Sequence, residues 1–96
     1  MNLEILYPLV TGAIRRAEVL DELGAPGAQH AYLDVSPLEE RIASLLPVSD
    51  AEGAIARRGA VSAAIAAHEF RRAEELAVRF APKLPWTIPC GLISQN

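Results

Sequence analysis

The feature of this sequence that most restricts its fold is a series of small residues spaced for one face of a helix. Glycine and alanine recur at alternating steps of three and four, which places them on a single helical face: Gly53, Ala56, Ala60, Ala63 and Ala67. A face without bulky side chains allows another helix backbone to approach closely. The spacing therefore predicts tightly packed helices. The stripe is a packing surface, because glycine and alanine carry no reactive side-chain groups.

The size and composition of the chain favour one helical core. Its 96 residues are enough for a single domain. Aromatic residues make up only 5% of the chain, and leucine and isoleucine supply most of the larger apolar side chains. The alternation of β-branched and aromatic residues that is typical of strands is nearly absent from the first 80 positions. We therefore expect an all-α, four-helix bundle-like domain over residues 1–96, with a C-terminal helical hairpin and an extended C-terminal tail.

The first helix is predicted over residues 3–23. Apolar residues keep a three-four spacing along it: Leu3, Leu6, Val10, Ala13, Ala17 and Leu20. Asn2 can cap its start, and Gly24 can end it in a left-handed conformation. Pro8 either kinks this helix or marks its true start, and we favour one kinked helix.

The second helix is predicted over residues 37–46 only. The sequence Ser36-Pro37-Leu38-Glu39 has the form of a capping box with proline at the first helical position. Residues 24–35 contain Gly24, Pro26 and Gly27 and show no helical period, so they are expected to form a long connection.

Two further helices are predicted over residues 50–67 and 69–81. A second capping box, Ser49-Asp50-Ala51-Glu52, begins the first of them, and Pro82 ends the second. So short a connection between two helices predicts an antiparallel hairpin. Residues 82–96 are expected to be extended and to dock on the bundle or on a second copy, because they carry several large apolar side chains.

Residues 54–86 resemble a single tetratricopeptide-type helical hairpin. Phe70, Ala73 and Pro85 fall in the register of that repeat, and His68 stands where its turn usually has glycine. The positions of the family's tryptophan, glycine and tyrosine hold other residues here, namely Arg57, Val61 and Ala64. The resemblance implies a peptide- or protein-binding surface. It also implies that the first two helices or another copy cover the faces that a single repeat leaves open.

Net charge and cysteine content restrict the expected partners and the expected cellular location of the protein. The net charge is −3 without a run of basic residues, so we do not expect nucleic acid as a partner. Cys90 is the only cysteine and cannot form an internal disulfide, which favours a cytoplasmic protein. The N-terminal apolar stretch lacks a preceding basic region and is too short for a membrane span. All but one of the nine basic residues are arginine, a usage typical of GC-rich bacterial genomes.

No spacing of residues predicts catalysis. His30 in the expected long connection and His68 at the expected turn are the only histidines, and neither belongs to a metal-binding motif. Cys90 has no basic neighbour to lower its pKa. We therefore expect no catalytic residue, cofactor or metal site. The alternative is a small enzyme or ligand-binding subunit with a pocket near His30 and His68.

Arginine occurs in three pairs, Arg15-Arg16, Arg57-Arg58 and Arg71-Arg72, and the last two differ in their expected partners. Arg72 has carboxylates one turn away, with Glu75 also within reach of Arg79, so this face is expected to be solvated and locally compensated. Neither Arg57 nor Arg58 has a carboxylate three or four residues away. Another helix is the favoured source of their counter-charge, and solvent or a partner's carboxylate or phosphate is the alternative.

The excess of packing features over polar motifs predicts a protein-interaction module. We expect a small cytoplasmic adaptor, chaperone-like or regulatory subunit that binds a protein or peptide partner and forms a homo-oligomer. The residues expected to make the interaction are Arg57, Arg58, Ala60, Ala63, Ala67, Phe70, Trp86, Ile88 and Leu92.

Overall fold

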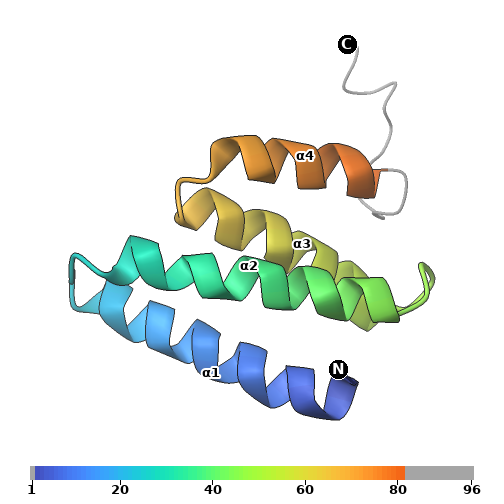
Figure 1. Ribbon diagram of the computed structural model, residues 1–96, viewed down its shortest axis with the longest axis horizontal. Helices are drawn as coiled ribbons and strands as arrows, with labels where there is room; N and C mark the ends of the chain where they lie inside the picture. The colour runs from blue at the N-terminus through green and yellow to red at the C-terminus, as the bar shows by residue number, and fades with distance from the viewer. Residues whose placement is uncertain (1, 82–96) are drawn as a thin grey trace.

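The computed structural model describes residues 2–81, which form four helices and no strand (Figure 1). The helices are α1 (Leu3–Glu22), α2 (Ala28–Leu45), α3 (Ala51–Ala66) and α4 (Phe70–Phe80). Each helix packs chiefly on its neighbours in the sequence, α1 on α2, α2 on α3 and α3 on α4. The all-α prediction is confirmed, and so is the tight hairpin of the last two helices.

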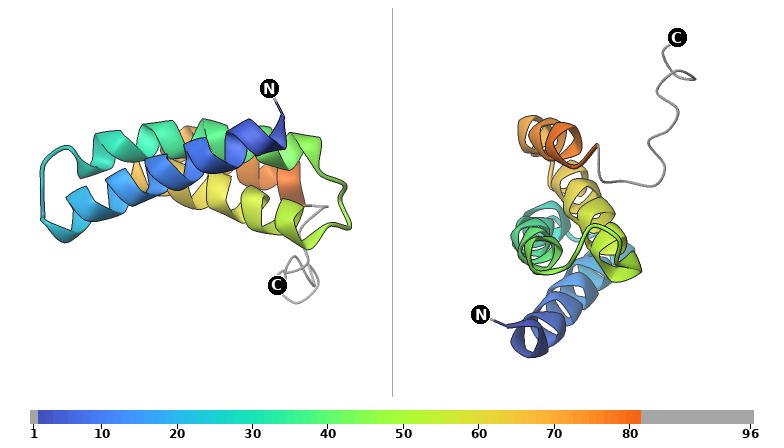
Figure 2. Two further views of the ribbon diagram at one scale, coloured as in Figure 1. Left: turned by 90° about the horizontal axis from the view of Figure 1, so that it is seen from below. Right: turned by 90° about the vertical axis from the view of Figure 1, so that its right-hand side faces the viewer.

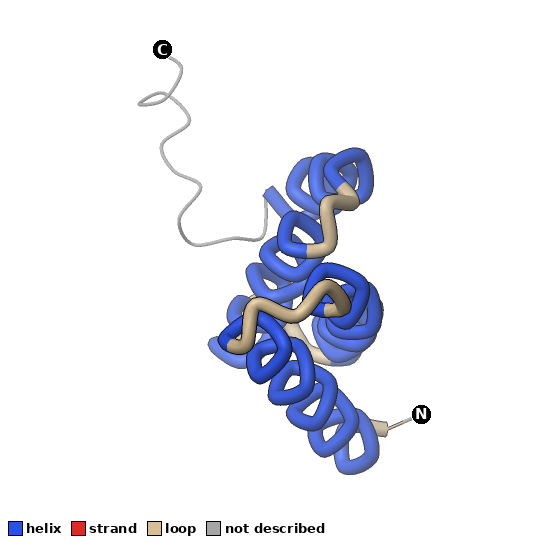
Figure 3. The backbone as a smooth tube through the Cα atoms, turned by 90° about the vertical axis from the view of Figure 1, so that its left-hand side faces the viewer, coloured by secondary structure: helices blue, strands red, loops and turns tan. Residues whose placement is uncertain are grey.

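The four helices form an open stack with α1 and α4 at its two outer ends (Figure 1). Viewed along the helices, α2 lies to one side of the line from α1 through α3 to α4 (Figure 2). The α1–α2 and α3–α4 connections lie at one end of the stack (Figure 3), and the α2–α3 connection lies at the other. The inner helices α2 and α3 are therefore covered on two sides, whereas α1 and α4 each pack mainly on one helix.

The stripe of small residues on α3 is buried, as predicted. Ala60 is 0% exposed, and the other four members of the stripe are buried as well. Gly53 marks a close approach, because a Cβ atom there would lie 3.1 Å from the carbonyl oxygen of Pro47 and 3.3 Å from Cβ of Leu46. Leu6 and Ile42, on α1 and α2, are the largest apolar side chains with almost no exposed surface. Small residues on α3 thus let the larger side chains of its neighbours fill the core.

The start and end of α1 follow the sequence. The Asn2 side chain accepts a hydrogen bond from the Ile5 amide at 3.1 Å. Gly24 adopts φ 65°, and its amide donates to the Asp21 carbonyl oxygen. Pro8 lies inside one helix that begins at Leu3, so it does not start the helix. Pro8 is the sixth residue of α1 and lies beyond the first turn, so it leaves the Glu4 carbonyl oxygen without its hydrogen bond from position 8.

The prediction for the second helix was wrong. It begins at Ala28, nine residues before the predicted start, so residues 28–35 are helical and His30 lies on α2 rather than in a long connection. Ser36 does not cap the helix, because its hydroxyl donates instead to the Ala60 carbonyl oxygen of α3 at 2.8 Å. Pro37 removes one backbone hydrogen bond from α2. Packing of both halves of α2 on α1 and α3 offsets that loss.

The ends of α3 and α4 differ slightly from the predicted bounds. Asp50, rather than Ser49, caps α3, and its carboxylate accepts a hydrogen bond from the Glu52 amide at 2.8 Å. After α3, His68 adopts φ 63°. Its amide donates to the Ile65 carbonyl oxygen, and the Glu69 amide donates to that of Ala64. This pair of bonds is the Schellman arrangement that usually places glycine at the left-handed position.

Replacing His68 by glycine is expected to give a protein more stable than the His68→Ala variant by about 1 kcal/mol, because only glycine adopts positive φ without steric cost. Comparison of these two variants removes the contribution of the His68 ring, which stacks on Phe70 at 5.5 Å between centroids. Gly24→Ala should lower the free energy of unfolding by a similar amount, because Gly24 holds the left-handed position at the end of α1. Urea unfolding measures all three, and equal stability of the two His68 variants would contradict the expectation.

The predicted extended tail, with Trp86, Ile88 and Leu92, lies outside the described residues. Within residues 2–81, no helix has both the length and the apolar character needed to cross a membrane.

Candidate functional site

The structure separates the predicted interaction residues into buried and exposed groups. Ala60, Ala63 and Ala67 are almost fully buried between helices of this chain, and Arg57 is buried as well. A protein partner therefore cannot pack against the three alanines in this fold, and Arg57 is reached only from the cavity that it lines. Phe70, at the start of α4, is 60% exposed, and Arg58 is also exposed.

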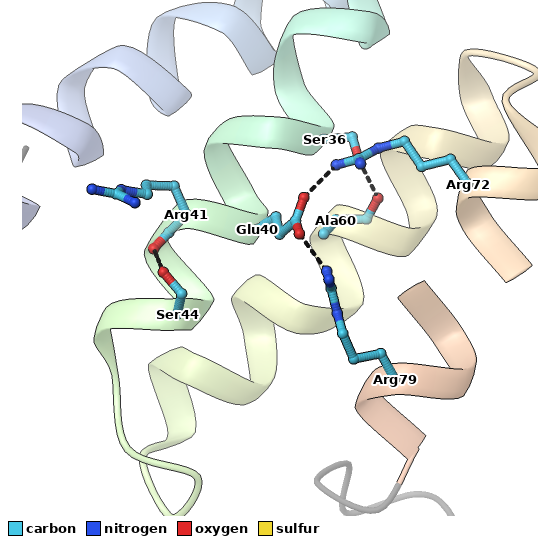
Figure 4. Close-up of polar contacts among 7 residues, drawn as sticks. All are labelled: Ser36, Glu40, Arg41, Ser44, Ala60, Arg72 and Arg79. Atoms are coloured by element: carbon cyan, nitrogen blue, oxygen red, sulfur yellow. Dashed lines mark hydrogen bonds and ion pairs between the residues drawn. The ribbon is translucent and has the colours of Figure 1, made fainter. Parts of the chain in front are cut away.

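A polar network joins α2, α3 and α4 around Glu40 (Figure 4). Arg72 donates to one carboxylate oxygen of Glu40 at 2.7 Å, and Arg79 donates to the other. Nε of Arg72 also donates to the Ser36 hydroxyl at 3.1 Å, and that hydroxyl donates to the Ala60 carbonyl oxygen. The four side chains and one carbonyl therefore hold α4 against the α2–α3 pair.

This network corrects the expected pairing of the arginines on α4. Arg72 and Arg79 form ion pairs with Glu40 of α2 rather than a locally compensated face with Glu75. Glu75 is a neighbour on the same helix, whereas the tight α3–α4 turn brings the two arginine side chains of α4 within reach of α2. The spacing of seven between the two arginines placed them on one face of α4, and this signal could have predicted a shared partner.

The neighbouring carboxyls Glu39 and Glu40 have opposite electrostatic environments. Burial alone would raise the pKa of Glu40, but the hydrogen bonds and charges of Arg72 and Arg79 outweigh it and lower that pKa. Burial raises the pKa of Glu39. The Glu39 carboxylate lies over Gly59, where a Cβ atom would come within 2.4 Å of it. Gly59 thus accommodates a side chain from α2 rather than a crossing of two backbones.

A cavity of about 340 Å³ adjoins this network, at the end of the stack that carries the α2–α3 connection and the end of α4. Glu40 and Arg79 form part of its wall, and so does Arg57 from α3. Arg57 is only 2% exposed. Its Nη2 donates to the Val48 carbonyl oxygen at 3.1 Å. The predicted ion pair between Arg57 and another helix is therefore replaced by a bond to a backbone carbonyl.

A second, more open cleft lies at the other end of the stack. His68 and Tyr32 line it together with Asp21, but His30 does not. The two histidines therefore do not share this cleft, which removes the geometric basis of the predicted pocket near His30 and His68. Among the described residues, no group of three or more histidine, cysteine, aspartate or glutamate side chains is placed to hold a metal ion.

The outer side of α1 carries an exposed stripe that the sequence reasoning missed. Six positions at alternating steps of four and three are exposed, here called the outer stripe: Ile5, Leu9, Gly12, Arg16, Val19 and Leu23. Its four large apolar side chains are between 46% and 74% exposed. The first four members each precede a buried residue of α1 by one position, so the two stripes lie about 100° apart. The spacing was visible in the sequence, but the first apolar stripe already explained why α1 is a helix.

Comparison with known proteins adds no identification. No protein family, curated protein or solved structure matches this chain. The resemblance of residues 54–86 to a tetratricopeptide-type hairpin therefore remains a prediction, while the hairpin itself is a feature of the fold.

Proposed function

We propose that this protein is a small cytoplasmic protein-interaction module that pairs with a second copy of itself through the outer stripe of α1. The single observation that carries the proposal is the second heptad-like series of apolar residues, which remains exposed after the first has packed on α2. Alternating steps of three and four are the spacing of helix–helix seams. The proposed role is therefore binding rather than catalysis.

The outer stripe has the symmetry that an antiparallel pair of identical helices requires. Its positions are arranged evenly about residue 14. In an antiparallel pair centred there, Ile5 faces Leu23 of the other copy and Leu9 faces Val19. At the centre, Arg16 faces Gly12, where the structure leaves open space for a large side chain. A two-fold interface needs this self-complementarity, because one surface must match itself.

The position of α3 leaves the outer stripe accessible. Tyr7 of α1 points towards α3, since its hydroxyl donates to Glu52 at 3.0 Å. Ile5 precedes Tyr7 by two positions, which corresponds to about 200° around the helix axis. The second copy would therefore approach α1 from the side opposite α3 without displacing it.

A carboxylate at Leu9, in the apolar part of the outer stripe, is expected to abolish self-association. In a two-fold pair each substitution occurs twice, and Leu9→Glu would bury two carboxylates in an apolar layer. Sedimentation equilibrium over a concentration series should show a dimer for the wild type and a monomer for Leu9→Glu.

Val78→Glu is the matched control, because Val78 is 70% exposed on α4 and lies outside the outer stripe. This variant should dimerise as the wild type does. A wild type that stays monomeric throughout the series would refute the proposal, and so would a Leu9→Glu variant that dimerises as well as Val78→Glu.

A further inference from the structure

Arg57 is a buried cation without a carboxylate partner among the residues that the structure describes. Neither ion pair among residues 2–81 involves it, and residues 1 and 82–96 contain no aspartate or glutamate. Its Nη2 reaches only the carbonyl oxygen of Val48, at 3.1 Å. Its Nε is buried and has no hydrogen-bond partner within the described part of the chain. No carboxylate side chain of this protein therefore neutralises the Arg57 charge.

This arrangement is costly for a small domain. A guanidinium remains protonated in proteins, so Arg57 cannot lose its charge as a buried lysine or carboxyl would. Burial of an unpaired charge, and of an N–H donor without an acceptor, lowers the stability of the folded state. The rest of the buried face of α3 consists of small residues and needs no long cationic side chain for packing.

The cavity beside Arg57 combines apolar walls with an excess of positive charge. Ala43, Leu46, Val48 and Phe80 supply apolar surface. Of the charged residues that line it within residues 2–81, Arg57 and Arg79 are cationic, and Glu40 is the only carboxylate. Both oxygens of Glu40 already accept hydrogen bonds, one from Arg72 and one from Arg79 (Figure 4). An anion that entered the cavity would therefore meet the guanidinium of Arg57, which forms no ion pair with the described residues.

We infer that this cavity binds a small organic anion, which places its carboxylate on Arg57 and its apolar body against Leu46, Val48 and Phe80. The volume of about 340 Å³ is at the lower end of the range for small-molecule pockets, so it suits a compact acid. A charge-assisted interaction with the guanidinium would supply the counter-charge that no carboxylate side chain of this protein supplies. This site lies at α2, α3 and α4 and is independent of the outer stripe of α1.

The test uses the whole 96-residue chain, labelled with ¹⁵N, and three probes: hexanoate, its neutral analogue hexanamide, and inorganic phosphate. Hexanoate should shift the amide signal of Val48 and the Nε–H signal of Arg57 but not the amide signal of Gly12 on α1. It should bind about tenfold or more tightly than hexanamide, because only the acid forms a charged hydrogen bond. Phosphate should bind more weakly than hexanoate, because it has no apolar body.

The matched variants are Arg57→Met and Arg71→Met. Methionine fills a volume similar to that of arginine without the charge, so Arg57→Met should stay folded by circular dichroism and lose hexanoate affinity about tenfold or more. Arg71 is exposed on α4 and does not line the cavity, so Arg71→Met should bind as the wild type does.

Several results would overturn the inference. These are equal affinity of the wild type for hexanoate and hexanamide, phosphate binding as tight as hexanoate binding, and shifts centred on Gly12 instead of Arg57. The wild-type titrations with the three probes decide the question even if Arg57→Met does not fold. Dimer formation is measured separately, so failure of this site and failure of the proposed self-association remain distinguishable.

Discussion

Replacement of Ala60 by leucine is expected to lower the free energy of unfolding by about 2 to 3 kcal/mol, a large share of the stability of a small domain. Ala60 is 0% exposed, and its carbonyl oxygen accepts the hydrogen bond from Ser36 of α2. A leucine side chain has no space there, so α2 and α3 would have to separate and that hydrogen bond would lengthen. Urea unfolding followed by circular dichroism measures the loss.

Ser62→Leu is the control for this substitution. Ser62 lies on the same helix two residues later and is exposed, so leucine should change the stability by no more than about 0.5 kcal/mol. A similar, small effect at both positions would show that the α2–α3 contact is looser than the burial of Ala60 indicates.

Substitution of Glu40 by glutamine is expected to lower the free energy of unfolding at pH 7 by about 1 to 2 kcal/mol. The change removes the charge that binds Arg72 and Arg79, and the exposure of Arg79 limits the loss. Glu39→Gln is the adjacent isosteric control. Burial raises the pKa of Glu39, so its loss of charge should leave stability unchanged or slightly increased. Urea unfolding should therefore show a loss of stability for Glu40→Gln and no loss for Glu39→Gln.

The pH dependence of unfolding should distinguish the contributions of Glu39 and Glu40 to stability. Glu40 has a folded pKa below its ordinary value of 4.5, so its stabilisation is present above that value and is lost as the pH falls through the folded pKa. Glu39 has a folded pKa above 4.5, so its contribution is greatest below 4.5 and is lost as the pH rises through the folded pKa. On acidification, Glu39→Gln should lose more stability than the wild type, and Glu40→Gln should lose less. Parallel curves for the three proteins would contradict these assignments.

Local signals in the sequence predicted most of the fold. Asn2 and Gly24 bound α1 because capping and left-handed φ depend on a few adjacent residues. The stripe on α3 predicted close packing because its spacing is a property of one helix. These features need no knowledge of the partner helix.

The errors arose where distant parts of the chain decide the outcome. Ser36 and Pro37 form a sequence pattern typical of a helix start, yet the Ser36 hydroxyl bonds to Ala60 of α3. The bond exists only because α2 and α3 pack together. Continuation of the apolar period through Ala28 and Val35 was the available signal that α2 begins earlier. The ion pairs of Glu40 likewise depend on tertiary contacts that a single sequence does not display.

The order of the helices in space has a consequence for how quickly the native state is reached. Each helix touches chiefly the helices next to it in the sequence, so most native contacts connect residues that are close along the chain. Helical proteins with such local contacts fold in microseconds to milliseconds, because little entropy is lost in closing loops before contacts form. The α1–α2 and α3–α4 hairpins can therefore each begin to form before the two halves meet at the α2–α3 contact.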